Sequence, residues 1–160
     1  MATFLSGERR LVMRILELWE NLRGARRFPS VSDVESADLG ACWANCFVIA
    51  VGAQPELSSF RYVGGGLLIP DWDEVAGRAV ADCPEHTVLR HASSYMTKVI
   101  HKRVPISIGG DFDVDESRIV YRSIILPLSD DGTLVNFLFG AANCRLVTGA
   151  GGLASPADIR

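Results

Sequence analysis

The sequence predicts an α+β domain, and three observations support this fold class. An amphipathic helical pattern opens the chain, two short strand segments follow it, and three strand segments fill the last third. The helical segments that remain are grouped between the second and third strands, instead of alternating singly with strands as in an α/β protein. A chain of 160 residues favours a single domain.

Composition excludes several classes of protein. Hydrophobic residues make up 48% and charged residues 22% of the chain, and the net charge is −3, which predicts no nucleic-acid partner. No apolar run reaches the roughly 18 residues that a membrane span needs. The first residues lack the order of a signal peptide, and the four cysteines are expected to be reduced thiols, so we expect a cytoplasmic protein.

The chain opens with an amphipathic helix, predicted over residues 1–25. Ser6 is its predicted N-cap and Gly24 its predicted C-terminal stop. The apolar spacing suits a helix that packs on its own domain, and it suits a short dimer seam equally well. Both alternatives remain open. The side chains of the hypothetical dimer helix are Leu11, Ile15, Leu18, Trp19 and Leu22.

A connector and two strands are predicted next. Residues 26–39 show no periodicity and are expected to form the connector, with a short helix near residues 36–42. Residues 46–52 are apolar and rich in branched side chains, which indicates a buried strand. Residues 60–63 form the second predicted strand.

Two helices are predicted between the strand groups. Asp71 and Glu74 have the spacing of a capping box, which predicts a short helix that ends at Gly77. Pro84 suits the first turn of a longer helix over residues 85–102. The apolar face of this longer helix contains Leu89, Ala92, Met96, Val99 and Ile100.

The last third of the chain is predicted to be β-structure. Strands are expected over residues 104–108, 117–128 and 134–147. Asp131-Gly132 indicates a two-residue type I′ hairpin between the last two strands. The expected domain therefore covers residues 26–147. The tail, residues 148–160, is small and polar and is expected to be disordered.

Three consecutive glycines, Gly64, Gly65 and Gly66, follow the second predicted strand. They lack the third glycine of a dinucleotide-binding fingerprint and the lysine of a phosphate-binding loop. Pro70 follows soon afterwards, where such a motif would need a sustained helix. The glycines are therefore predicted to allow a bend and a close approach of the backbone.

The order of elements is similar to the PAS fold, a five-stranded antiparallel sheet with helices on one face. Trp19 to Arg23, followed by Arg26 and Pro29, resembles the Trp-x-x-Leu-Arg and Arg-x-x-Pro opening of a PAS family common in alphaproteobacteria. Arg61-Tyr-Val-Gly64 resembles the second strand of that family, although Gly65 stands where the family usually has threonine. The short segment that ends at Gly77 and the Leu-Pro-Leu before Asp131 fit the same order.

The resemblance implies a stand-alone, non-enzymatic sensory or regulatory protein. It implies action through a homodimer and through a signalling partner such as a histidine kinase. The alternatives are a sensor of a small ligand or cofactor, such as flavin, haem or a metabolite, and a small enzyme on an α+β scaffold. No hydrolase or metalloprotease motif is present, so no catalytic residue is predicted.

In the PAS arrangement, the inner face of the sheet meets the long helix. Apolar side chains alternate along three predicted strands and would line this cleft. The alternatives are plain core packing and an apolar pocket with a few polar groups for a small ligand. A shift of register by one residue would exchange the faces. The hypothetical pocket residues are Phe47, Ile49, Met96, Tyr121, Ser123, Phe137 and Phe139.

Cofactor and metal sites are not predicted. Asn143-Cys144-Arg145 looks like the core motif of flavin-binding PAS domains, but it falls at the end of a strand and not on a helix. His91 and His101 should project away from the cleft, which argues against haem. Cys42 and Cys46, with Cys83 or a histidine, are only a weak zinc hypothesis.

Overall fold

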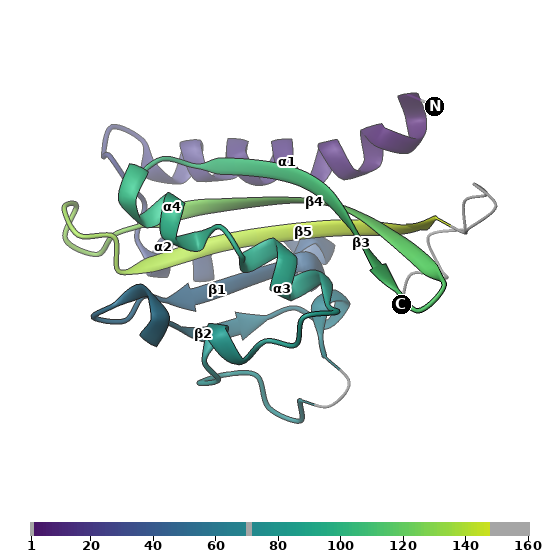
Figure 1. Cartoon of the computed structure of the whole chain (residues 1–160). Helices are drawn as coiled ribbons and strands as arrows, with labels where there is room; N and C mark the ends of the chain where they lie inside the picture. Colours follow the sequence, from purple (N-terminus) through teal and green to yellow (C-terminus); the bar gives the residue numbers. More distant parts are fainter. Residues whose placement is uncertain (1, 70–71, 148–160) are drawn as a thin grey trace.

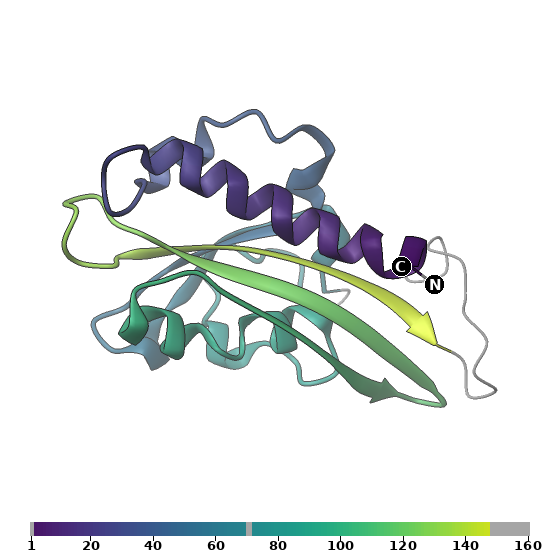
Figure 2. The ribbon, with the colours of Figure 1, turned by 90° about the horizontal axis from the view of Figure 1, so that it is seen from above.

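The computed structural model describes residues 2–69 and 72–147, and the side chains from residue 9 onward. A single antiparallel sheet runs through the molecule, with strand order β2-β1-β5-β4-β3. The first helix covers one face, and two shorter helices cover the other (Figures 1 and 2). This arrangement confirms the predicted fold class. The strands are β1 Cys46–Ala50, β2 Ser59–Val63, β3 Ile106–Val114, β4 Ser117–Leu128 and β5 Phe137–Val147.

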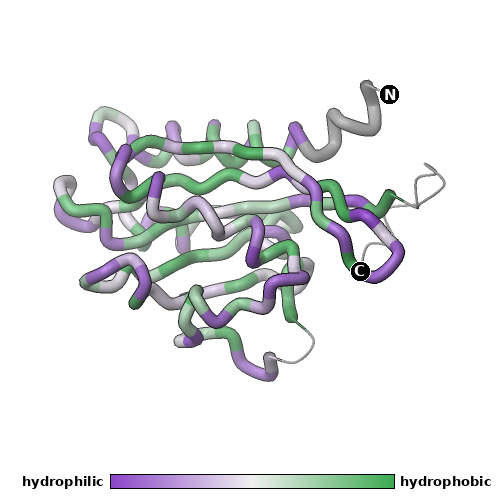
Figure 3. The backbone as a smooth tube through the Cα atoms, in the orientation of Figure 1, coloured by the Kyte–Doolittle hydropathy of each residue, from purple (hydrophilic) through white to green (hydrophobic). Residues whose placement is uncertain are grey.

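In the described part of the chain, four α-helices and four short 3₁₀ segments surround this sheet. Apolar residues concentrate in the middle of the sheet, and polar residues gather in the loops at its ends (Figure 3). No helix in the described part of the chain is long and apolar enough to cross a membrane. The helices are α1 Ala2–Arg23, α2 Val31–Glu35, α3 Val88–Ser93 and α4 Met96–Lys102, and the 3₁₀ segments are η1 Gly40–Asn45, η2 Pro55–Leu57, η3 Gly65–Leu67 and η4 Val80–Asp82.

Helix α1 packs on its own domain. Ile15 is fully buried and Val12 and Trp19 nearly so, against the face of β4 and β5. The Trp19 indole N–H donates a hydrogen bond of 2.8 Å to the Pro127 carbonyl, which ties the helix to β4. The predicted N-cap is wrong, because α1 begins at Ala2 and runs through Ser6. Gly24 ends the helix in the left-handed conformation, with φ 56°.

Helix α2 interrupts the predicted connector, so the prediction of an aperiodic segment there is wrong. Ser30 and Asp33 form a capping box, in which the Ser30 hydroxyl accepts from the Asp33 N–H and the Asp33 carboxylate accepts from the Ser30 N–H. The hydrogen bond from Ser30 N–H is the main reason that the pKa of Asp33 is lowered. Only five residues follow the cap, which is too short a segment for periodicity to reveal.

Both helices predicted between the second and third strands differ from the observed structure. Residues 72–77 are not helical, and the predicted cap Asp71 lies outside the described residues. The long helix is two helices, because the chain breaks at Ser94 and Tyr95. It also begins later than predicted, at Val88, where the Thr87 side chain accepts a hydrogen bond from the Arg90 N–H.

The late strands are partly as predicted. Strand β4 has the predicted bounds, whereas β3 begins later than predicted and extends to Val114. The type I′ turn at Asp131-Gly132 is wrong, since Gly132 has a positive φ of 81° but Asp131 does not. Residues 129–136 instead form a longer loop, in which the Asp131 carboxylate accepts from the N–H groups of Thr133 and Leu134. The predicted disordered tail lies outside the described residues.

Candidate functional site

The inner face of the sheet, which meets α3 and α4, contains the side chains predicted on β1 and β4. Ser123 identifies this face, because its hydroxyl donates a 3.1 Å hydrogen bond to the Ala92 carbonyl on α3. Tyr121 shares the face, since side chains two residues apart on a strand point the same way. Phe47 and Ile49 also belong to it, because Phe47 and Ile125 both pair with Gly140 of β5.

The predicted face of β5 is wrong by one residue. Phe139 pairs with Val48 and Leu126, on the side of the sheet that faces α1. Its ring lies 6.1 Å from the Trp43 ring, and the Arg61 guanidinium lies over the ring of Phe137. The residues that face α3 and α4 are instead Leu138, Gly140 and Ala142. Because residues 137–142 are apolar or small on both sides, alternation could not select the register.

Side chains of the domain itself fill the centre of the inner face. The Phe47 ring lies directly over Gly140, so that a Cβ at residue 140 would overlap the ring. Phe47, Ile49, Ile125 and Leu138 are all fully buried. The predicted pocket residues Phe47, Ile49 and Ser123 are therefore fully buried on this face.

One polar pair is embedded in this apolar face. The Tyr95 hydroxyl and the Ser123 hydroxyl lie 2.8 Å apart and share a hydrogen bond. Burial raises the pKa of Tyr95, so this phenol stays neutral. Tyr95 was missed by the sequence reasoning, because it lies at the break between α3 and α4 where a continuous helix was expected. The pair joins this break to β4.

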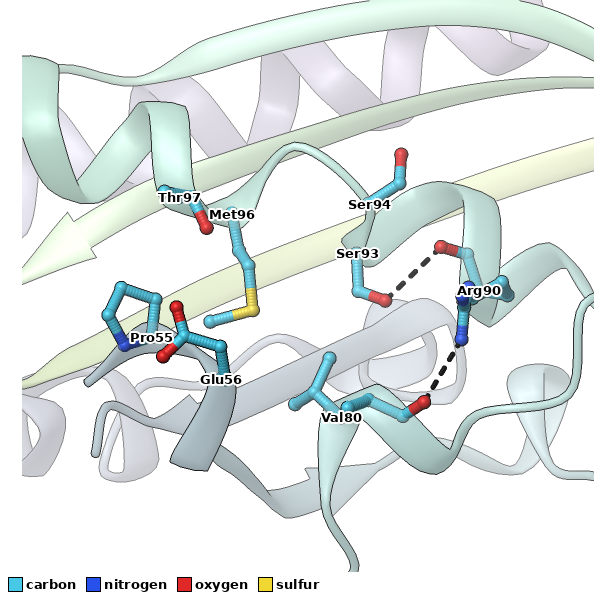
Figure 4. Close-up of a pocket in the computed structure, with 9 residues that line it drawn as sticks. Pro55, Glu56, Val80, Arg90, Ser93, Ser94, Met96 and Thr97 are labelled. Carbon is cyan, nitrogen blue, oxygen red and sulfur yellow. Dashed lines mark hydrogen bonds between the residues drawn. The ribbon is translucent and has the colours of Figure 1, made fainter. Parts of the chain in front are cut away.

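A pocket of about 240 Å³ opens beside the cleft, between the α3–α4 pair and the two 3₁₀ segments η2 and η4 (Figure 4). Met96 is the predicted pocket residue among those that line it. Glu56 and Arg90 bring opposite charges to its walls, and Ser94 and Thr97 add hydroxyl groups. The Arg90 guanidinium donates to the carbonyls of Ala81 and Cys83, which holds α3 against η4. The pocket therefore combines charged and hydroxyl groups with apolar walls, and it lies off the apolar centre of the sheet.

The histidines differ in their surroundings. His86 and His101 are exposed, as expected for His101. His91 does not project into water as predicted: it is half-buried and stacks on Phe112 of β3, with ring centroids 4.0 Å apart. Burial is the main reason that the pKa of His91 is lowered. The sequence could not anticipate this contact, because it depends on where the edge strand passes the helix.

The cysteines give no support to the zinc hypothesis. Among the described residues, no three His, Cys, Asp or Glu side chains are grouped as metal ligands. The Cys46 thiol donates to the Cys42 carbonyl, and burial raises the pKa of this thiol to about 12. Cys144 lies in β5, opposite Tyr121, and thus on a strand as expected.

The three glycines mark a close approach of two backbone segments. A Cβ at Gly64 would overlap the carbonyl groups of Trp43 and Ala44, and one at Gly66 would lie 2.8 Å from the Ala44 carbonyl oxygen. Gly65 has open space around it. The predicted backbone approach is thereby confirmed, and its partner is the 3₁₀ segment η1.

Comparison with known proteins identifies the family. No curated protein sequence matches the chain. A solved structure of a fungal LOV domain photoreceptor is similar at 18% identity and a TM-score of 0.42, over 82% of this chain and 90% of that one. Residues 8–142 match the family model PAS_5, described as a PAS domain. The chain therefore belongs to the PAS domain family, whose members serve sensory and regulatory roles.

Proposed function

We propose that this protein is a non-enzymatic regulator that acts through dimerisation and through binding to a signalling partner such as a histidine kinase. The observation that carries the proposal is the packed inner face, where the Phe47 ring occupies the space over Gly140. A face filled by the domain's own side chains favours regulation by contact between proteins. A resident cofactor at the centre of the sheet would require these side chains to move.

The predicted dimer contact on α1 depends on which of its side chains remain outside the core of the domain. Ile15 and Trp19 contribute to the core, and Leu11, Leu18 and Leu22 pack against it. The outward side of the helix carries Met13, which is 62% exposed, between polar residues such as Glu17 and Glu20. Between residues 9 and 23, the outward side of α1 thus offers a second copy mostly polar surface, which favours a dimer contact elsewhere.

Native mass spectrometry of the purified protein tests the proposal, since it reports the mass of the assembly and any retained ligand together. The expected result is a dimer without retained ligand. A monomer at every concentration would contradict dimerisation, and a stoichiometric small molecule would favour a ligand sensor. Binding to a histidine kinase is tested separately by titration with the purified kinase domain.

The pocket beside the cleft supports a second candidate function, that of a small-ligand sensor. Its Glu56 and Arg90 side chains suit a small polar molecule that carries both an amino group and an acidic group. A thermal-shift screen of amino acids would detect such a ligand through its stabilisation of the folded state. Glu56→Gln should weaken that stabilisation, whereas Glu17→Gln, a matched change on α1, should leave it unchanged.

A further inference from the structure

The two edges of the sheet are covered differently. The β2 edge is occupied by the segment that leads into η4: Phe60 exchanges backbone hydrogen bonds with Gly77 and Arg78, and the Val80 N–H donates to Ser58. The β3 edge pairs with β4 on its inner side. Within the described part of the chain, no backbone hydrogen bond reaches its outer side. In Figures 1 and 2, β3 borders the sheet, with α1 on one side and α3 and α4 on the other.

Strand β3 lacks most of the features that block pairing between sheet edges. It is nine residues long, and its register with β4 runs from Ile106 to Val114 without a bulge. It contains no lysine and no proline. Natural proteins usually protect an exposed edge by such charges, prolines, bulges or short length. Within the described residues nothing occupies the outer backbone groups of this strand, so they can accept another strand.

Strand β3 is symmetric about Gly110 in its pattern of burial, because residues equally far from Gly110 on either side have the same burial. If a second copy pairs in antiparallel orientation with Gly110 opposite Gly110, half-buried residues meet half-buried ones and exposed residues meet exposed ones. The two acidic residues then lie opposite small residues and not opposite each other. The remaining opposed pairs are Ile106 with Val114, Ser107 with Asp113, Ile108 with Phe112, and Gly109 with Asp111.

The two glycines at the centre fit this arrangement. Gly110 already has a role within the monomer, because the Tyr121 side chain lies over it and would have to shift for a Cβ, which would come within 2.9 Å of the Tyr121 hydroxyl. Gly109 has no such role: a Cβ there would have ordinary contacts of 3.6 Å or more. Within one copy, the contacts around Gly109 do not require a small residue. In the pair of copies, a small residue there makes room for Asp111 of the second copy.

We propose that β3 is the homodimer edge, where two copies pair antiparallel about Gly110 and join their five-stranded sheets into one. This inference rests on the dimerisation in the proposed function and assigns it to a strand. The apolar residues on the inner side of β3 would form a continuous strip across the join, and this burial adds to the backbone pairing.

Substitution of Ser107 provides the test, since this side chain is exposed in the monomer and lies opposite Asp113 of the second copy. Ser107→Lys creates two opposite-charge pairs per dimer, and Ser107→Asp creates two like-charge pairs. Sedimentation velocity should show a dimer Kd that falls with lysine and rises with aspartate, each by roughly two- to thirtyfold relative to wild type. High salt should reduce both differences.

Met13→Glu on the outward side of α1 is the control and should leave the Kd unchanged. A wild-type protein that stays monomeric up to about 1 mM overturns both the proposed dimerisation and the edge assignment. A dimer whose Kd is the same for both Ser107 variants overturns the edge assignment alone. A dimer that responds to Met13→Glu and not to Ser107 places the contact on α1. Circular dichroism of each variant verifies that the monomer remains folded.

Discussion

The two faces of the sheet are built from alternate residues of the same strands, yet they are closed in different ways. On the inner face, the Phe47 ring lies over Gly140 and a hydrogen-bonded pair, Tyr95 and Ser123, connects the helix break to β4. On the other face, Ile15 and Trp19 of α1 supply apolar cover with one hydrogen bond to β4. The comparison shows that α1 completes the core of the domain on one face, while side chains of the sheet itself, with Phe47 over Gly140, pack at the centre of the other.

The largest expected effect is the loss of stability on substitution of Trp19, which shows how much α1 contributes to the core. Trp19→Ala removes a buried ring and its hydrogen bond to Pro127, so the free energy of unfolding should fall by about 3–5 kcal/mol. Urea denaturation followed by circular dichroism measures this. Met13→Ala, on the exposed side of the same helix, should change the free energy by less than about 0.5 kcal/mol. A loss below about 1 kcal/mol for Trp19→Ala would mean that α1 contributes little to the stability of the domain.

Adding a methyl group at residue 140 tests how tightly the inner face of the sheet is packed. Gly140→Ala places a methyl group into the Phe47 ring, and the free energy of unfolding should fall by about 1–3 kcal/mol or more. Phe47→Leu makes room, so the double variant should be more stable than the sum of the single changes predicts. A double-mutant cycle measures this coupling, expected at about 0.5–3 kcal/mol. Strict additivity would show that the ring does not occupy this space in solution.

The two hydroxyl groups of the Tyr95–Ser123 pair should contribute unequally to the free energy of unfolding. Ser123→Ala leaves the buried Tyr95 hydroxyl without its partner and should cost about 1–3 kcal/mol. Tyr95→Phe leaves Ser123 bonded to the Ala92 carbonyl and should cost only about 0.5–1.5 kcal/mol. Thermal and urea unfolding of both variants gives the ranking. Equal costs would indicate that water replaces the missing hydroxyl.

The smallest effect lies beyond the sheet, at the cap of α2. The Asp33 pKa is lowered in the folded state, so its contribution to stability is complete above its ordinary pKa and is lost as pH falls through the folded pKa. Asp33→Asn should cost less than about 1 kcal/mol at neutral pH, because the carboxylate is only half-buried and is screened by solvent. The difference between variant and wild type should shrink as pH is lowered below 4. A constant difference across this pH range would contradict the role of the carboxylate.

The sequence predicted the parts of the fold that follow from local pattern. The bounds of β4, the inward side chains of β1 and the apolar face of the α3–α4 segment all follow from periodicity. The family resemblance was visible in Trp19, Arg61 and the spacing of later motifs, and the family match confirms that the chain is a PAS domain. The α3–α4 segment shows why a local pattern can suffice, since it has one apolar face and one polar face.

Other features depend on contacts that no local pattern contains. Residues 137–142 of β5 are apolar or small on both faces, so only pairing with β1 and β4 determined which of them face α3 and α4. The stack of His91 on Phe112 and the pair of Tyr95 with Ser123 join residues far apart in the chain. The apolar stripe of α1 fitted a dimer seam and a core helix equally, and the burial of Ile15 and Trp19 depends on the sheet beneath them. The physical reason is the same in each case: burial depends on what a side chain meets, and the sequence specifies only what the side chain is.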